Sequence, residues 1–102
     1  MTVEELKARI DAGKRPVVLD VREARELRIA AFPFQVLHIP LGSLPQRVAE
    51  LPRNEEIVCA CRSGGRSASA ARFLVQSGFT AVNLDGGILA WSARIDPSIR
   101  QY

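Results

Sequence analysis

The chain has 102 residues, of which 47% are hydrophobic and 25% are charged, and its formal net charge is +3. This length fits a single domain, expected over residues 1–102, and the composition excludes a disordered chain and a collagen-like repeat. The apolar runs are far shorter than the roughly 20 residues of a membrane-spanning helix, and residues 1–5 lack the apolar segment of a secretory signal. We therefore expect no membrane contact and a cytoplasmic location.

The basic residues are twelve arginines and only two lysines. Guanidinium groups bind carboxylates and oxyanions better than ammonium groups do. The arginines are scattered, however, and most lie close to Asp or Glu in the sequence, whereas a nucleic-acid interface needs a clustered basic stripe. We therefore expect no nucleic-acid partner.

The first half of the chain alternates helical and strand patterns. Thr2 and Glu5 have the spacing of a capping box, and Gly13 supplies a stop for the helix that follows. Pro40 ends the second apolar run. In chain order we expect a helix over residues 3–12, a strand over 16–21, a short helix over 23–29 and a strand over 36–39.

The second half continues the alternation. Ser43 is the expected N-cap of one helix, and Gly78 suits a left-handed cap at the end of the next. The expected elements are a helix over residues 44–51, a strand over 56–61, a helix over 66–76, a strand over 80–84 and a helix over 88–93. Because several strands are apolar on both faces, the pattern predicts an α/β fold with a parallel sheet covered on both faces. Functional sites in such sheets form at the carboxyl ends of the strands.

Cys61 ends the most apolar of these strands and precedes a glycine-rich turn into a helix. Gly64 and Gly65 let several backbone N–H groups converge on one point, and the helix adds its positive N-terminal end. Arg62 and Arg66 add full positive charge. Each effect favours a thiolate, so we expect the pKa of Cys61 to lie below its ordinary value and the thiolate to act as a nucleophile. The alternative is a buried core cysteine beside a tight connection.

Three other residues carry weaker signals. Cys59 lies too close to Cys61 for an ordinary disulfide, and we interpret it as a buried, inert cysteine rather than a resolving thiol. His38 is the only histidine and belongs to another segment, so we interpret it as a packing or surface residue and expect no metal site. Trp91 lies on the apolar side of the last helix and is expected in the core.

Residues 61–67 (CRSGGRS) closely resemble the active-site loop of single-domain rhodanese-like sulfurtransferases. Further segments resemble motifs of that family in the same order along the chain, namely residues 18–23 (VLDVRE), 39–42 (IPLG) and 84–91 (LDGGILAW). The resemblance implies a three-layer rhodanese-like α/β fold with a five-stranded, mostly parallel sheet flanked by helices. The chain departs from the family at residues 32–36 (FPFQV), where two aromatic rings are expected to make the pocket wall more apolar.

The resemblance also implies a two-step sulfur transfer. The Cys61 thiolate attacks the outer sulfur of a donor such as thiosulfate, sulfite leaves, and loop N–H groups stabilise the resulting persulfide. An acceptor such as cyanide, a thiol or a sulfur-carrier protein then takes the sulfur. We expect no metal ion and no organic cofactor.

The resemblance also implies roles for other residues of the loop and of the first motif. Arg62 and Arg66 are expected to attract a small anionic sulfur donor, and Ser63 to add a hydroxyl donor. Ser67 closes the loop motif as a supporting residue. The resemblance places Asp20 and Arg22 beside the loop as residues that hold it. The alternative for these two is a surface ion pair.

The end of the chain is similar to the rhodanese-like domain at the C-terminus of some E1-like adenylyltransferases. The similar residues are 86–91, 95–97 (IDP) and Tyr102. Those enzymes put sulfur onto ubiquitin-like sulfur carriers, so the resemblance suggests such a carrier, or a desulfurase, as a partner. It also leaves open a second function, a sulfur-relay or docking module with little activity towards free thiosulfate.

The length of the loop separates two chemistries. Related phosphatases and arsenate reductases resemble this fold but use a C-x5-R loop, which cradles a tetrahedral oxyanion. The interval from Cys61 to Arg66 is C-x4-R, which suits a single sulfur atom, and the loop contains no acidic residue to act as a general acid. We therefore favour sulfur transfer and keep a small phosphatase or arsenate reductase as the less favoured alternative.

Overall fold

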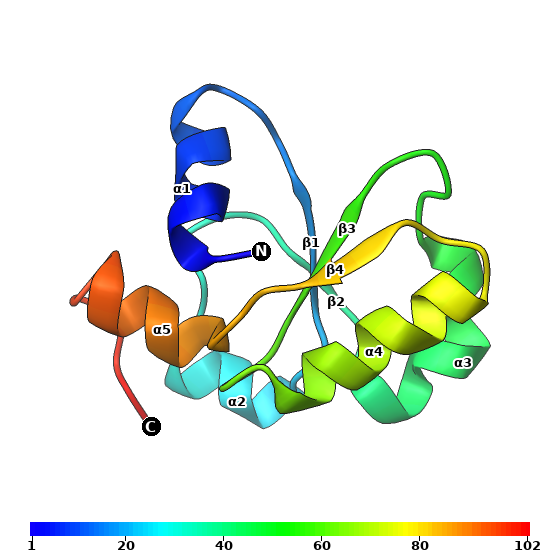
Figure 1. Cartoon of the computed structure of the whole chain (residues 1–102). Coiled ribbons are helices and arrows are strands. Elements are labelled where there is room, and N and C mark those ends of the chain that lie inside the picture. Colours follow the sequence, from blue (N-terminus) through cyan, green and yellow to red (C-terminus); the bar gives the residue numbers. More distant parts are fainter.

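A sheet of four parallel strands forms the centre of the computed structural model, which describes residues 1–102 (Figure 1). The strands are β1 (Val17–Asp20), β2 (Leu37–His38), β3 (Ile57–Ala60) and β4 (Ala81–Asn83), in the spatial order β2-β1-β3-β4. In register, Leu19 of β1 pairs with Leu37 of β2 and with Cys59 of β3. Because all strands run the same way, their carboxyl ends meet at one edge of the sheet, where Cys61 follows β3.

The expectation of a fifth strand is wrong. The position beside β4 is taken by Met1 alone, whose amino group donates to Asn83 O across 2.9 Å. The Met1 carbonyl accepts from Asp85 N, also across 2.9 Å. These two bonds follow the parallel pattern, but one residue is too short to form a strand. The sequence itself contains only four strand patterns, and the fifth strand came from the resemblance alone.

Helices cover both faces of the sheet, as expected for a three-layer fold (Figure 1). The helices α1 (Val3–Asp11) and α5 (Gly87–Arg94) lie on one face, and α3 (Leu44–Arg47) and α4 (Gly65–Gln76) lie on the other. The short helix α2 (Ala24–Ile29) follows β1 and lies near the amino end of α4. None of these helices is long and apolar enough to cross a membrane.

Two apolar clusters fill the spaces between the layers. Alternation along each strand sends Leu19, Ile57 and Cys59 towards α3 and α4, and sends Val18 and Val58 towards α1 and α5. Trp91 is 2% exposed and belongs to the second cluster, as predicted. Burial of both faces explains why β1 and β3 are apolar along their whole length.

Capping residues in the sequence predicted the positions of most helix ends. Thr2 accepts a hydrogen bond from Glu5 N as the N-cap of α1, and Gly78 has a φ of +91° after α4. Ser43 is the N-cap residue of α3, as expected, but its side chain makes no cap hydrogen bond. The predicted helix over residues 44–51 is a single α-helical turn between two 3-10 turns, η1 (Leu41–Ser43) and η2 (Val48–Glu50).

The aromatic residues of the divergent segment lie in the α1/α5 layer. The rings of Phe32 and Phe34 stack with centroids 5.2 Å apart, and each makes a T-shaped contact with Trp91. Phe34 also lines a cavity of about 450 Å³ near the start of β1. Cys61 is not among the residues that line this cavity.

Candidate active site

Cys61 lies directly after β3, with only 1% of its surface exposed. Its Sγ accepts a hydrogen bond from Gly64 N at 3.1 Å and another from Ser67 Oγ at 3.3 Å. Cys61 forms no disulfide. The sulfur is therefore a single reduced atom held by donors from the turn that follows it and from the first turn of α4.

Gly64 gives this turn its shape. Its φ of +106° lies in the left-handed region, which side chains disfavour, and a Cβ here would lie 3.2 Å from Gly86 N. The Gly64 carbonyl accepts from Asn83 Nδ2 at 3.2 Å, so the end of β4 fixes the turn. Gly65 has open space where a Cβ would stand and is the first residue of α4.

The amino end of α5 supports the loop from the other side. Ile88 N donates to Cys61 O at 3.0 Å, and Leu89 N donates to Arg62 O at 3.1 Å. Gly87 makes this approach possible, because a Cβ there would lie 2.4 Å from Cys61 O. With the loop carbonyls directed to α5, the Ser63 amide faces the opposite way, towards the sulfur.

The pKa of Cys61 is lowered from its ordinary value of 9.0. Burial is the largest single effect and acts to raise it, but the hydrogen bonds together outweigh burial. They come from the Ser67 hydroxyl and from the backbone amides of Ser67, Gly64 and Ser63. The direction agrees with the prediction, and the amides that were expected to converge on the sulfur are among its main causes, together with the Ser67 hydroxyl.

The hydroxyl that reaches the sulfur belongs to Ser67, and the side chain of Ser63 is exposed. Ser67 Oγ also lies 2.5 Å from Asn83 Oδ1. A hydroxyl has one proton, so Cys61 and Asn83 compete for it, and a charged thiolate is the stronger acceptor. Asn83 was not singled out from the sequence, although its position at the carboxyl end of a strand beside β3 is the signal that indicates it.

Arg66 is held by a residue from α2. Its Nη1 and Nη2 lie 2.6 and 2.9 Å from the two carboxylate oxygens of Glu26. The hydrogen bonds from Arg66 are the main cause that lowers the pKa of Glu26 from 4.5 to about 2. The pKa of Arg66 is raised, chiefly by Glu26 and in smaller part by the charge of Cys61. Glu26 was missed in the sequence, because it is one of several acidic residues on a short, charge-rich segment.

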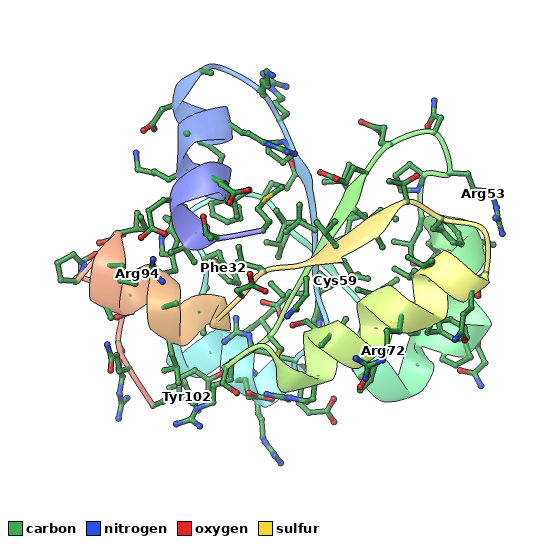
Figure 2. The ribbon with its side chains drawn as sticks, viewed as in Figure 1. Phe32, Arg53, Cys59, Arg72, Arg94 and Tyr102 are labelled. Carbon is green, nitrogen blue, oxygen red and sulfur yellow. The ribbon has the colours of Figure 1, made fainter.

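Arg62 is held by the last residue of the chain. Its guanidinium lies over the ring of Tyr102, 5.0 Å from the centroid, and donates to the Tyr102 carbonyl. The Tyr102 hydroxyl donates to Glu26 at 2.8 Å and accepts from Arg22 at 3.0 Å. Tyr102 lies beside α2 in Figure 2, and it connects the carboxyl end of the chain to the loop.

Asp20 and Arg22 form a buried ion pair at 2.8 Å, not a surface pair. Neither side chain makes a hydrogen bond to residues 61–67. Arg22 reaches the loop indirectly, through Tyr102 and Glu26, and it also donates to Ala30 O at 2.9 Å. His38 Nε2 donates to the Arg22 carbonyl across 2.7 Å, so its ring lies beside this pair.

Cys59 lies deep in β3 with no exposed surface. Burial raises its pKa to about 12, so it stays a neutral thiol at any physiological pH. No three His, Cys, Asp or Glu side chains gather into a group that would hold a metal ion. Cys61 is thus the one thiol whose surroundings favour the thiolate.

Comparisons with known proteins agree with this arrangement. A sequence model of the Rhodanese-like domain matches residues 2–94. A sulfurtransferase of Allochromatium vinosum is 36% identical over 90 residues, covering 87% of this chain and 83% of that protein. The adenylyltransferase and sulfurtransferase MOCS3-1 of Zea mays is 32% identical over 109 residues, but these are 100% of this chain and 23% of that protein. The crystal structure of a rhodanese-related protein from Thermoplasma volcanium has a TM-score of 0.85 and 31% identity, covering 100% of this chain and 97% of that one.

Proposed function

The chain belongs to the rhodanese-like family, and we propose that it transfers a sulfur atom through a persulfide on Cys61. The hydrogen-bond geometry at Cys61 Sγ carries this proposal. Ser67 and three backbone amides favour the thiolate there, and a thiolate is the form of cysteine that attacks sulfur. The sulfurtransferase names of two relatives support sulfur transfer as the general chemistry.

With thiosulfate as donor, the first step forms one bond and breaks one. The Sγ anion of Cys61 attacks the outer sulfur of thiosulfate, the bond between the two thiosulfate sulfurs breaks, and sulfite leaves with the electron pair. The negative charge then lies on the outer sulfur of the Cys61 persulfide. The amides of Ser63 and Gly64, which serve the thiolate, are positioned to stabilise this charge.

In the second step a nucleophilic acceptor takes the outer sulfur and leaves the Cys61 thiolate. Cyanide, a small thiol or a ubiquitin-like sulfur-carrier protein would serve, and a desulfurase persulfide would serve as the donor. The likeness to MOCS3-1, an adenylyltransferase and sulfurtransferase, supports a protein partner. A relay that exchanges sulfur only between proteins is the second candidate. The low exposure of Cys61, which is 1%, supports it, because free thiosulfate meets little of this residue in bulk solvent.

Steady-state turnover of thiosulfate and cyanide tests the proposal. We expect thiocyanate from the native protein, none from Cys61→Ser, and near-native rates from Cys59→Ala, which removes the other thiol. Saturation only at very high thiosulfate favours the relay, provided that a protein persulfide loads Cys61. Thiocyanate formation by Cys61→Ser would overturn the proposal.

A further inference from the structure

Both arginines of the loop already contact other residues of the chain. Arg66 gives two hydrogen bonds to Glu26, and Arg62 lies on the ring and carbonyl of Tyr102. The Arg66 side chain is 38% exposed, so it lies at the surface beside the loop rather than in the core. The carboxylate of Glu26 places a full negative charge directly beside Arg66.

The Glu26 carboxylate is buried and is held by hydrogen bonds from other parts of the chain. It is 7% exposed, and its Oε1 accepts from Glu23 N at 3.1 Å in the capping box of α2. Its Oε2 accepts from the Tyr102 hydroxyl at 2.8 Å. Both carboxylate oxygens of Glu26 therefore have hydrogen-bond donors within the chain. Glu26 holds Arg66 in this same conformation.

A guanidinium that is paired in this way offers little net charge to a third group. A doubly charged donor gains little from Arg66, because the Glu26 carboxylate offsets the charge of the guanidinium. A singly charged donor depends less on the charge of Arg66, so the pairing of Arg66 with Glu26 weakens its binding less. The backbone amides around Sγ, which carry only partial charges, serve both donors equally.

We propose that Glu26 is a specificity-determining residue, which holds Arg66 and so makes the site favour singly charged sulfur donors over doubly charged ones. This inference rests on the proposed function, since it concerns the donor that loads Cys61. It assigns the choice of donor to a residue on α2, outside the loop that contains the cysteine.

Thiosulfate and methanethiosulfonate test the inference, because they differ by one charge and react alike. In both, the Cys61 thiolate attacks the outer sulfur and the sulfur–sulfur bond breaks. Sulfite leaves from thiosulfate, and methanesulfinate leaves from methanethiosulfonate, each with the bonding electron pair. The ratio of the two kcat/KM values, with cyanide as acceptor, measures the preference for charge.

Glu26→Gln is expected to raise this ratio in favour of thiosulfate by about tenfold, because it frees the Arg66 cation at the site. The double variant Glu26→Gln with Arg66→Gln has the net charge of the native protein, and its ratio should return close to the native one. Glu23→Gln removes the same charge from the exposed N-cap of the same helix and should leave the ratio unchanged.

An unchanged ratio in a folded Glu26→Gln protein would overturn the inference, and so would an equal rise in Glu23→Gln. If Glu26→Gln does not fold, Glu26→Asp gives the second measurement. Its shorter carboxylate cannot make both bonds to Arg66, and a smaller rise in the ratio is expected, whereas no rise would overturn the inference. Failure of the native protein to take sulfur from either donor would instead count against the proposed function, so the two failures are distinguishable.

Discussion

Ser67 donates a hydrogen bond to the Sγ of Cys61 across 3.3 Å, and it is the only side chain that does so. The two residues are six positions apart, so the intervening turn must fold back for the contact to form. The left-handed Gly64 and the bond from Asn83 to its carbonyl produce that turn. The acidity of Cys61 is therefore a property of the loop and of β4 together.

Ser67→Ala should raise the pKa of Cys61, because the methyl group leaves only the amides to stabilise the thiolate. The absorbance of the thiolate as a function of pH measures the pKa of Cys61 in each protein. Cys59 does not ionise in the pH range of this titration, since its pKa is about 12. Ser63→Ala, which removes an exposed hydroxyl, is the control and should leave the titration unchanged. A Ser67→Ala curve that overlies the native curve would contradict the assignment.

Cys59 should make the protein lose stability in base. Its pKa is about 12 in the folded chain against an ordinary 9.0, so above about pH 9 the unfolded chain releases a proton that the folded chain keeps. Stability therefore falls as the pH rises, by roughly 2–3 kcal/mol between about pH 9 and about pH 11. Urea unfolding of the native protein and of Cys59→Ala over this range should give a shallower slope for the variant. Equal slopes of stability against pH in the two proteins would mean that the ionisation of Cys59 does not cause the loss of stability.

Arg22→Leu should destabilise the fold by about 3–5 kcal/mol, because it leaves the Asp20 carboxylate buried without a cation. It also removes the hydrogen bonds to Ala30 and Tyr102. Chemical unfolding measures the change. Arg47→Gln, which breaks the exposed pair between Arg47 and Glu50, should have little effect. Similar losses in the two variants would contradict the burial of the Asp20–Arg22 pair.

Gly87→Ala should destabilise the protein by on the order of 2–4 kcal/mol, since the new Cβ meets the carbonyls of Cys61 and Arg62 at 2.4 and 2.6 Å. The loop has to move away from α5, so sulfur transfer should fall as well. Gly42→Ala, with no atom within 4 Å of the added Cβ, is the matched control. Full activity in Gly87→Ala would show that α5 does not position the loop.

The sequence predicted the features that depend on neighbouring residues. The strands β1, β3 and β4 lie inside the predicted ranges, because each is a short apolar run between turn residues. The thiolate-favouring loop followed from its own glycines. The contacts of Glu26 and Tyr102 were not predictable in this way, because they join residues 40 and 76 positions apart. Asn83 was missed for the same reason, since only the pairing of β3 with β4 brings it to Ser67.

The expected charge effect of the arginines illustrates the difference. A sequence shows Arg62 and Arg66 beside Cys61 but cannot show that Tyr102 and Glu26 already hold both guanidinium groups. The lowered pKa of Cys61 and the part of the backbone amides in it were predicted correctly, while the part of the Ser67 hydroxyl required its atomic position. Charge counted along a chain is thus a weaker guide to a site than hydrogen-bond donors located in space.

Intact-mass analysis after treatment with a sulfur donor tests the central claim most directly. The native protein should gain the mass of one sulfur atom from methanethiosulfonate or thiosulfate and lose it on addition of cyanide. Cys59→Ala should behave in the same way, and Cys61→Ser should gain nothing. A native protein that gains no sulfur from an excess of either donor, or a Cys61→Ser variant that still gains it, would contradict the account.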